Sequence, residues 1–345
     1  MQPLTNTVTD PAHDLLPPLA TRLTAAALDA LLDLGSGQLP HPALVQTLLE
    51  PATEFLRRPG HGFRSRLVEI GWSLAGRDDV CPPVLPMVVE VIHAGSLIVD
   101  DIQDDSPSRR RRPALHRLYG LPLALNVGNW FYFWPFQLLP ALELPADVEL
   151  SLHRRLTRTM ARCHAGQALD LGVRVSTAAQ CTLPAVVNAT SDLKTGSLTE
   201  LSAWLGAAAG GAPDRMADAV ARFARRMGVG LQMLDDLQNL RGTGDPSRRH
   251  EDLRLGRPTW PWAWCAQRLD ARRFRALQRR AGAVERGGPA ADVARTLDGL
   301  VRAHGLRTAR TALDRALGDL RHTVGSAASL APLEAELERL CARHG

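Results

Sequence analysis

Residues 84–113 read VLPMVVEVIHAGSLIVDDIQDDSPSRRRRP, so an apolar stretch of helical length runs directly into four carboxylates and then four guanidinium groups. Residues four positions apart share a face of a helix, which places Asp100 and Asp104 together with Asp101 beside them. Carboxylates crowded in this way at the end of an apolar helix need cations, and Mg²⁺ typically binds one or two carboxylates together with phosphates. The stretch therefore predicts a site for divalent cations and a diphosphate.

A second stretch has the same form. Residues 232–239 read QMLDDLQN at the end of another apolar segment, so Asp235 and Asn239 lie four positions apart with Asp236 alongside. One acidic cluster alone is usually a solvated helix face, but two clusters that each follow an apolar helix favour a shared site. In an antiparallel bundle, both clusters would lie at the same end of a central cavity.

The whole chain has the composition of an all-α protein. Of its 345 residues, 45% are hydrophobic and only 5% aromatic, and no alternating run of β-branched residues predicts a sheet. We expect a flexible leader over residues 1–20 and a single helical-bundle domain over residues 21–345, with a central apolar cavity. Helical patterns cover residues 19–34, 41–57, 64–76, 84–104, 120–140, 147–172, 182–190, 194–209, 214–240, 258–282, 289–302 and 306–341.

Charge, hydropathy and cysteine usage exclude several classes of protein. The formal net charge is +5, but the arginines are mixed with 36 acidic residues, which argues against a nucleic-acid partner. The longest apolar segment, residues 130–142, is too short for a membrane span and is broken by Pro135 and Pro140. The five cysteines are scattered without a Cys-x-x-Cys pair, so we expect no disulfide framework or zinc site, and a cytoplasmic location.

Basic residues near the first acidic stretch suit phosphate binding. Lys194 is the single lysine among forty arginines, which indicates a need for a compact ammonium group, although a surface position is the alternative. Arg109 and Arg110 begin the arginine run and are able to bind phosphate oxygens bidentately. Arg64 and Arg66 open another predicted helix, where they either bind a second diphosphate or form a charged helix start.

Two further features have both a structural and a functional interpretation. His93 lies two helical turns before Asp100 and shares its face, where it is either a ligand contact or a core histidine. Residues 130–134 read WFYFW, and Trp130, Phe131 and Trp134 either line the cavity, where their π faces stabilise a cation, or pack in the core.

Together these residues resemble the trans-polyprenyl synthetases, also called isoprenyl diphosphate synthases, which have the class I terpenoid synthase fold. The resemblance runs from about Gly60 to Pro261. The family's first aspartate-rich motif and the segment after it are matched without a gap by Asp100–Asp104, Arg109, Arg110, Pro113 and His116. Further matches in the family's order are His93, Ser96, Leu97, Gly166, Gln167, Asp170, Lys194, Thr195, Gln232, Asp235, Asp236, Asp252, Leu253 and residues 256–259.

The resemblance implies an enzyme that ionises an allylic prenyl diphosphate and condenses it with isopentenyl diphosphate. Three Mg²⁺ ions would be held by Asp100, Asp104 and Asp235, with Asp101, Asp236 and Asn239 as further metal positions. The allylic diphosphate would contact Arg109, Lys194, Thr195 and Gln232, and the second diphosphate would contact Arg64, Arg66, His93 and Arg110. We also expect a homodimer.

Small residues before the first motif bear on product length. Gly95 and Ser96 would leave room for a growing chain, so the resemblance implies a product of C20 or longer. Trp130 and Trp134 remain candidates for closing the pocket farther down.

Three positions depart from the family pattern and keep two alternatives open. Phe63 occupies the place of a lysine, Asn239 that of an aspartate and Glu251 that of another lysine. A class I terpene cyclase on the same scaffold would ionise a diphosphate without using isopentenyl diphosphate. A non-catalytic regulatory subunit of a heteromeric synthase is the second alternative.

Overall fold

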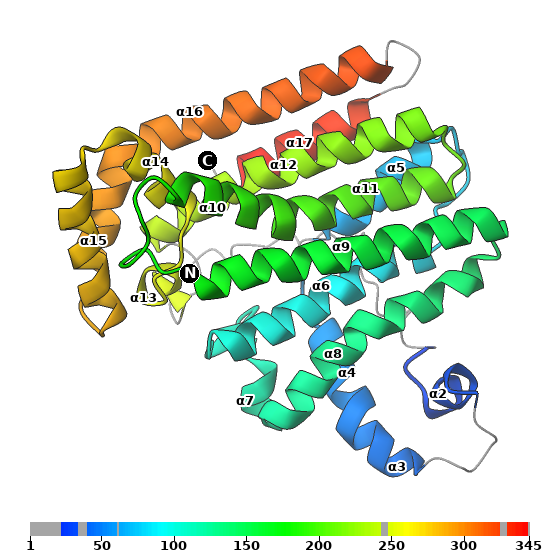
Figure 1. Ribbon diagram of the computed structural model, residues 1–345. Helices are drawn as coiled ribbons and strands as arrows, with labels where there is room; N and C mark the ends of the chain where they lie inside the picture. Colours follow the sequence, from blue (N-terminus) through cyan, green and yellow to red (C-terminus); the bar gives the residue numbers. More distant parts are fainter. Residues whose placement is uncertain (1–21, 34–39, 61, 243–247, 325–329, 344–345) are drawn as a thin grey trace, which may run out of the picture.

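The computed structural model describes residues 22–33, 40–60, 62–242, 248–324 and 330–343 (Figure 1). The prediction of an all-α protein is confirmed, because the strands in these ranges are two short segments that pair as a hairpin, β1 (Ser108–Arg109) and β2 (Arg112–Pro113). The leader predicted over residues 1–20 lies outside the described residues.

Helices fill the remainder of the regular structure. The α-helices are α2 (Ala25–Leu31), α3 (His41–Leu44), α4 (Glu50–Leu56), α5 (Phe63–Leu74), α6 (Val84–Gln103), α7 (Leu115–Tyr119), α8 (Leu121–Leu138), α9 (Ala146–Gly172), α10 (Leu183–Ser191), α11 (Ser197–Ala209), α12 (Asp214–Arg241), α13 (Glu251–Arg254), α14 (Trp260–Arg268), α15 (Ala271–Glu285), α16 (Ala291–Val324) and α17 (Ala331–Ala342). Two π-helical turns, η2 (Val45–Leu49) and η4 (Asp192–Gly196), and one 3₁₀ turn, η3 (Leu139–Leu142), join neighbouring helices.

Helix α6 is central and apolar around most of its circumference. It begins directly after Pro83, and Leu85, Met87, Val88 and Val91 have no exposed surface. A helix that is apolar on all sides is buried by its neighbours, and α5, α8 and α11 pack around α6. The acidic residues at its last turn therefore lie where the helix leaves the core.

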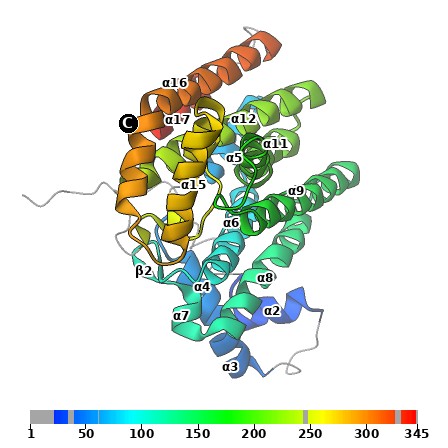
Figure 2. The same ribbon diagram turned by 60° about the vertical axis from the view of Figure 1, so that its left-hand side comes forward.

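Two hydrophobic clusters make up the core, and Figures 1 and 2 show how the helices that build them are arranged. One gathers side chains of α12, α14 and α16, and the other those of α6, α8 and α11. Helices α5 and α11 approach closely because Gly71 and Gly206 have no side chain: a Cβ at Gly206 would lie 1.8 Å from the Val68 carbonyl oxygen. Any larger residue at Gly206 would force these helices apart.

The predicted helix limits differ from the structure in several places. The single helix predicted over residues 306–341 is the end of α16 and a separate helix, α17. The segment predicted as one helix over residues 258–282 is two helices, since the Asp270 side chain accepts a hydrogen bond from the Arg273 backbone N–H and caps α15. The break predicted between residues 302 and 306 is absent, because α16 is continuous and Gly305 packs within it. A Cβ at Gly305 would lie 2.4 Å from the Trp264 ring, so this glycine serves close packing.

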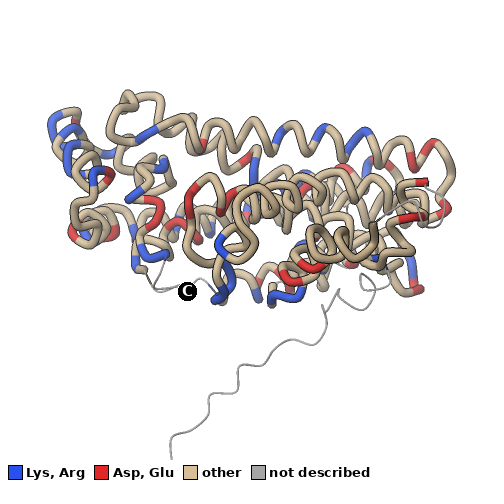
Figure 3. The backbone as a smooth tube through the Cα atoms, turned by 90° about the horizontal axis from the view of Figure 1, so that it is seen from below, with Lys and Arg blue, Asp and Glu red and all other residues tan. Residues whose placement is uncertain are grey.

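Basic and acidic residues are interspersed along the described backbone (Figure 3). No described helix has the length and apolar character required to cross a bilayer.

Candidate active site

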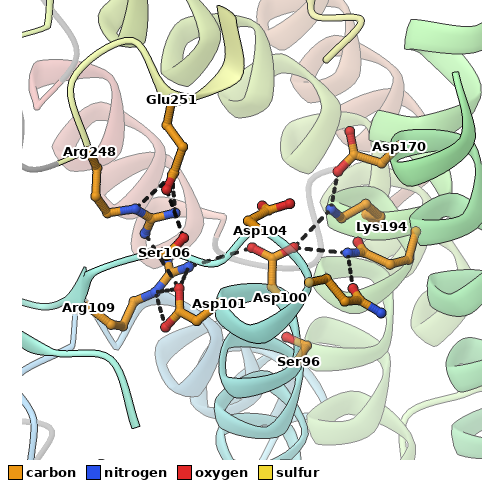
Figure 4. Close-up of polar contacts among 12 residues, drawn as sticks. Ser96, Asp100, Asp101, Asp104, Ser106, Arg109, Asp170, Lys194, Arg248 and Glu251 are labelled. Carbon is orange, nitrogen blue, oxygen red and sulfur yellow. Dashed lines mark hydrogen bonds and ion pairs between the residues drawn. The ribbon is translucent and has the colours of Figure 1, made fainter. Parts of the chain in front are cut away.

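Both acidic stretches lie near the C-terminal ends of long helices, α6 and α12. The C-terminus of a helix carries a partial negative charge, so carboxylates there are unfavourable unless cations or hydrogen-bond donors surround them. In α6 the cations are present. Asp100 lies between the Lys194 ammonium, at 3.7 Å, and the Arg109 guanidinium, at 3.5 Å, and accepts a hydrogen bond from Gln167 at 3.0 Å (Figure 4).

These neighbours determine the ionisation of Asp100. Burial by itself would raise its pKa, but Lys194 and Arg109 outweigh burial and lower the pKa below its ordinary value. Lys194 in turn donates a 2.7 Å hydrogen bond to Asp170. Burial would lower the pKa of Lys194, but Asp100 and Asp170 raise it, so this ammonium group stays charged.

Two of the other aspartates of the first stretch, Asp101 and Asp104, are bound by arginines that lie at the site. Asp101 is fully buried and accepts hydrogen bonds from Arg109 Nε through both carboxylate oxygens, at 2.9 and 3.0 Å. Asp104 accepts from Arg257, which is itself buried. Burial, together with the neighbouring Asp100, raises the pKa of Asp104 to about 6 despite the Arg257 contact.

The second stretch is held by neutral donors. Asp236 is buried and accepts hydrogen bonds from the Trp260 backbone N–H and from Gln232 Nε2, both at 2.8 Å. Asn239 donates from Nδ2 to Asp252 at 3.0 Å. Burial raises the pKa of Asp236 well above its usual value and that of Asp252 to about 6.

A pocket of about 570 Å³ lies between the two stretches. Its polar part is lined by carboxylates, amides and cations, and its interior by apolar and aromatic side chains. On α8 the wall is Tyr132, whose ring meets the His164 ring edge-to-face at 5.2 Å. The lining includes Arg64, Ile92, His93, Ser96, Leu97, Asp100, Arg109, Tyr132, Met160, Cys163, His164, Gln167, Lys194, Thr195, Leu198, Gln232, Asp235, Asn239, Arg248 and Asp252.

Residues 45–288 match the protein family described as polyprenyl synthetase. The chain belongs to the polyprenyl synthetase family. It is 31% identical over 218 residues to geranylgeranyl pyrophosphate synthase 2 of Zymoseptoria tritici, a match that covers 63% of each chain. It is 28% identical over 218 residues to geranylgeranyl pyrophosphate synthase of Mucor circinelloides f. lusitanicus, covering 62% of this chain and 68% of that one. The match thus spans somewhat under two thirds of the length of the first of these relatives.

Solved structures of polyprenyl synthetases share the fold. Decaprenyl diphosphate synthase from Rhodobacter capsulatus matches with a TM-score of 0.70 at 22% identity, over 96% of this chain and 97% of that one. Heptaprenyl diphosphate synthase from Staphylococcus aureus matches with a TM-score of 0.74 at 15% identity, over 96% and 98%. The predicted isoprenoid synthase architecture is therefore confirmed.

The pocket collects about half of the residues predicted from the sequence. Those in its lining are Arg64, His93, Ser96, Asp100, Arg109, Lys194, Thr195, Gln232, Asp235 and Asn239. Those outside its lining are Arg66, Gly95, Asp101, Asp104, Arg110, Trp130, Phe131, Trp134 and Asp236. Of the second set, Asp101 and Asp236 lie directly behind pocket residues, as their hydrogen bonds to Arg109 and Gln232 show, whereas Asp104 is bound by Arg257, which is itself outside the lining.

Of the positions predicted to bear on product length, Ser96 borders the pocket, whereas Gly95, Trp130 and Trp134 do not. Gly95 packs against α8, where a Cβ would lie 2.8 Å from the Gly128 carbonyl oxygen, so its small size serves helix packing. Trp130 and Trp134 stack on each other, with ring centroids 4.8 Å apart, and Phe131 is fully buried in the core.

The arginines predicted for the second diphosphate have different environments. Arg64 borders the pocket with Nη1 3.2 Å from His93 Nε2, and its guanidinium lies 4.4 Å from the centroid of the Phe63 ring. Burial lowers the pKa of Arg64 to about 10. Arg66 instead donates from Nε to Glu336 of α17, at 2.9 Å.

Several pocket residues had no role predicted from the sequence. Tyr132 lies within the aromatic run, and only its position on the inner side of α8 distinguishes it from its neighbours. Asp252 belongs to the segment that matched the family, so a signal for it was present. Arg257 of the same segment, with arginine in place of the family's lysine, lies outside the lining and contacts Asp104. Arg248 follows a segment outside the described residues and had no such signal.

Proposed function

We propose that this chain is a prenyltransferase that condenses an allylic prenyl diphosphate head-to-tail with isopentenyl diphosphate, giving an all-trans polyprenyl diphosphate of C20 or longer. The observation that carries the proposal is a single pocket that combines two kinds of lining. Carboxylate and amide oxygens and fixed cations line its polar part, and apolar side chains line the rest. That division suits a diphosphate head with a hydrocarbon tail. The two fungal relatives, named as geranylgeranyl pyrophosphate synthases, support the same reaction.

The residues present are suited to Mg²⁺. Asp100, Asp235, Asp252 and Asn239 offer the hard oxygen ligands that this ion prefers. In the described part of the chain, no three acidic, histidine or cysteine side chains are close enough to hold a metal by themselves. This arrangement fits Mg²⁺ ions that take some of their ligands from substrate phosphates. When bound, the ions would neutralise the charge that develops on the departing diphosphate.

The fixed cations would hold the allylic diphosphate. Lys194 and Arg109 lie on either side of Asp100, where they would contact the phosphate oxygens, and Gln232 is oriented by a 2.8 Å hydrogen bond from Thr195. Asp101 keeps Arg109 in place. Preorganised donors of this kind stabilise the charge of the departing group without rearranging during the reaction.

Arg64 and His93 would receive the diphosphate of isopentenyl diphosphate. Arg64 is partly buried and borders the pocket, and its Nε has no hydrogen-bond partner among the described residues, so an anion is its natural partner. Phe63 supports this guanidinium through its π face. The loss of lysine at position 63 is therefore compatible with a second diphosphate site. Arg66 and Arg110 would act on this site from outside the pocket lining.

The reaction then follows from these positions. The C–O bond of the allylic diphosphate breaks, and its electron pair leaves with the diphosphate. The double bond of isopentenyl diphosphate attacks the allylic cation, forming the new C–C bond, and a proton is lost to the released diphosphate. Apolar side chains such as Ile92 and Leu198 exclude water from the cation.

Assembly, location and domain organisation complete the proposal. We expect a homodimer in the cytoplasm with one domain over residues 21–345. The five cysteines are all free thiols in the structure, which suits a reducing compartment.

One experiment separates the proposed reaction from a cyclase and from a regulatory subunit. The purified chain with Mg²⁺ is incubated with dimethylallyl, geranyl, farnesyl and geranylgeranyl diphosphates, each with and without isopentenyl diphosphate. Longer diphosphates that form only when isopentenyl diphosphate is present support the proposal. Hydrocarbon release without it would indicate a cyclase, and turnover only after addition of a partner subunit would indicate a regulatory role.

A further inference from the structure

Arg58 follows the C-terminal end of α4, and its side chain has no exposed surface. A buried guanidinium requires carboxylate or carbonyl oxygens to accept its hydrogen bonds. Nε and Nη2 donate to the Glu54 carboxylate at 3.0 and 2.7 Å, and the group lies 5.0 Å from the centroid of the Phe55 ring. Its other hydrogen bonds reach a part of the chain more than fifty residues away.

These bonds fasten the β1–β2 hairpin to the end of α4. Arg58 Nη1 donates to the Arg109 carbonyl oxygen at 3.2 Å, and Nη2 donates to the Pro113 carbonyl oxygen at 2.9 Å. One side chain therefore binds the last residue of both strands. In return, Arg110 Nη1 donates to the Arg58 carbonyl oxygen at 3.1 Å, and Arg112 lies 3.1 Å from the Glu54 carboxylate.

The hairpin depends on this support because its own stability is low. Each strand has two residues, and two-stranded hairpins are marginal even when longer. The turn consists of Arg110 and Arg111 at φ +54° and +62°, a left-handed conformation that costs about 1–2 kcal/mol for each residue with a side chain. Contacts from outside the hairpin must offset this cost.

The hairpin also carries a pocket residue. The Arg109 side chain leaves β1 toward Asp101 and Asp100 and lines the pocket. We propose that Arg58, together with Glu54, is a positioning residue for diphosphate binding: it fixes the Arg109 backbone so that this guanidinium stays aimed into the pocket. The inference rests on the proposed function, which assigns Arg109 to the diphosphate.

The test compares Arg58→Met with Arg57→Met, which replaces a neighbouring arginine that is exposed. Arg58→Met should lower kcat/KM for prenyl diphosphates about 10- to 100-fold, as expected when a binding group is displaced by roughly 1 Å. Its affinity for inorganic pyrophosphate with Mg²⁺, measured by calorimetry, should fall as well. Arg57→Met should behave like the unmodified chain, and Arg58→Lys, which keeps the charge but not the fork of donors, should be intermediate.

A double-mutant cycle distinguishes positioning from general destabilisation. If Arg58 acts through Arg109, adding Arg58→Met to Arg109→Met should change kcat/KM by less than about twofold, since the group to be positioned is already gone. Circular dichroism measures the folded fraction of each variant. If Arg58→Met does not fold, Arg58→Lys takes its place in the cycle. Equal effects of Arg58→Met in both backgrounds would overturn the inference.

The outcomes also separate this inference from the proposed function. If the unmodified chain turns over prenyl diphosphates and Arg58→Met has the same kcat/KM as Arg57→Met, the role of Arg58 is refuted and the proposed function stands. If the unmodified chain turns over no prenyl diphosphate but binds pyrophosphate, the proposed function fails, and the two variants' pyrophosphate affinities still decide the role of Arg58. If it neither turns over nor binds, both fail.

Discussion

The two acidic regions share a sequence form but differ in the groups that bind their carboxylates. At the end of α6, charged donors surround the carboxylates: Lys194 and Arg109 for Asp100, and Arg257 for Asp104. At the end of α12 and in α13, the partners of Asp236 and Asp252 are amides and a backbone N–H.

This difference indicates a division of labour. Fixed cations lower the pKa of Asp100, so this carboxylate is charged and balanced before any ligand arrives. Burial raises the pKa of Asp252 to about 6, and no cation lowers this pKa as effectively as Lys194 and Arg109 lower that of Asp100. Asp100 is therefore balanced by cations of the protein itself, whereas Asp252 has a deficit of positive charge that Mg²⁺ would supply.

The largest expected effect is loss of turnover when either region is neutralised. Asp100→Asn and Asp235→Asn should each lower kcat by at least about 10³-fold. Each variant removes a charged ligand of the Mg²⁺ ions that would stabilise the departing diphosphate. Steady-state kinetics at saturating Mg²⁺ measure this loss. Asp105→Asn is the matched control, because the Asp105 side chain is 81% exposed, and near-normal activity of all three variants would refute the assignment.

The second prediction concerns stability against pH without metal. Because the folded pKa of Asp252, about 6, exceeds its unfolded value of 3.8, its contribution to stability falls as pH rises from about 4 to about 6. Asp252→Asn does not titrate, so it should be more stable than the unmodified chain at pH 7.5 by about 1–2 kcal/mol. This gain should shrink as pH falls below 6. Urea denaturation at several pH values measures it.

Asp100→Asn provides the contrast for that measurement. The folded pKa of Asp100 is below its unfolded value, so the stability it contributes is present above the unfolded pKa and is lost only in acid, as pH falls through the folded pKa. The variant should therefore be destabilised at pH 7.5, which lies above the pKa of Asp100 and that of Asp104, about 6. If both variants changed stability in the same direction at pH 7.5, the contrast between the regions would be wrong.

The third prediction concerns the apolar part between the regions. Tyr132→Ala opens the pocket wall on α8 and should lengthen the product by about one or two isoprene units, because the growing tail gains the volume of an aromatic ring. Trp130→Ala, an aromatic residue on the same helix outside the lining, should leave product length unchanged. Mass spectrometry of the products gives the lengths, and the opposite ranking would return the limit to Trp130.

The sequence predicted much of the fold because helical periodicity and Pro or Gly punctuation are local signals. It failed where packing decided. A break was predicted between residues 302 and 306, yet Gly305 lies inside α16 against Trp264. The hairpin at Ser108–Pro113 was not predicted, since its turn residues are arginines rather than the glycine or asparagine that usually mark such turns.

For the site, the sequence predicted types of residue better than positions. Charged groups such as Asp100 and Lys194 were identifiable because their chemistry has few alternatives in an apolar setting. The sequence did not identify which of the five aromatic residues lines the pocket. Side chains one or two positions apart on a helix face different neighbours, and only the packing of α6 on α8 selects Tyr132.

The smallest expected effect lies in the hairpin beside the first region. Arg111 has φ +62° and is exposed, so Arg111→Gly removes left-handed strain while adding chain entropy to the unfolded state. The net change should be stabilising by less than about 1 kcal/mol. Arg112→Gly is the control: this neighbour is exposed, has no positive φ and pairs with Glu54, so glycine there should destabilise. Thermal melts that rank the two variants in the reverse order would mean that the turn is not strained, and the support from Arg58 would then have less to offset.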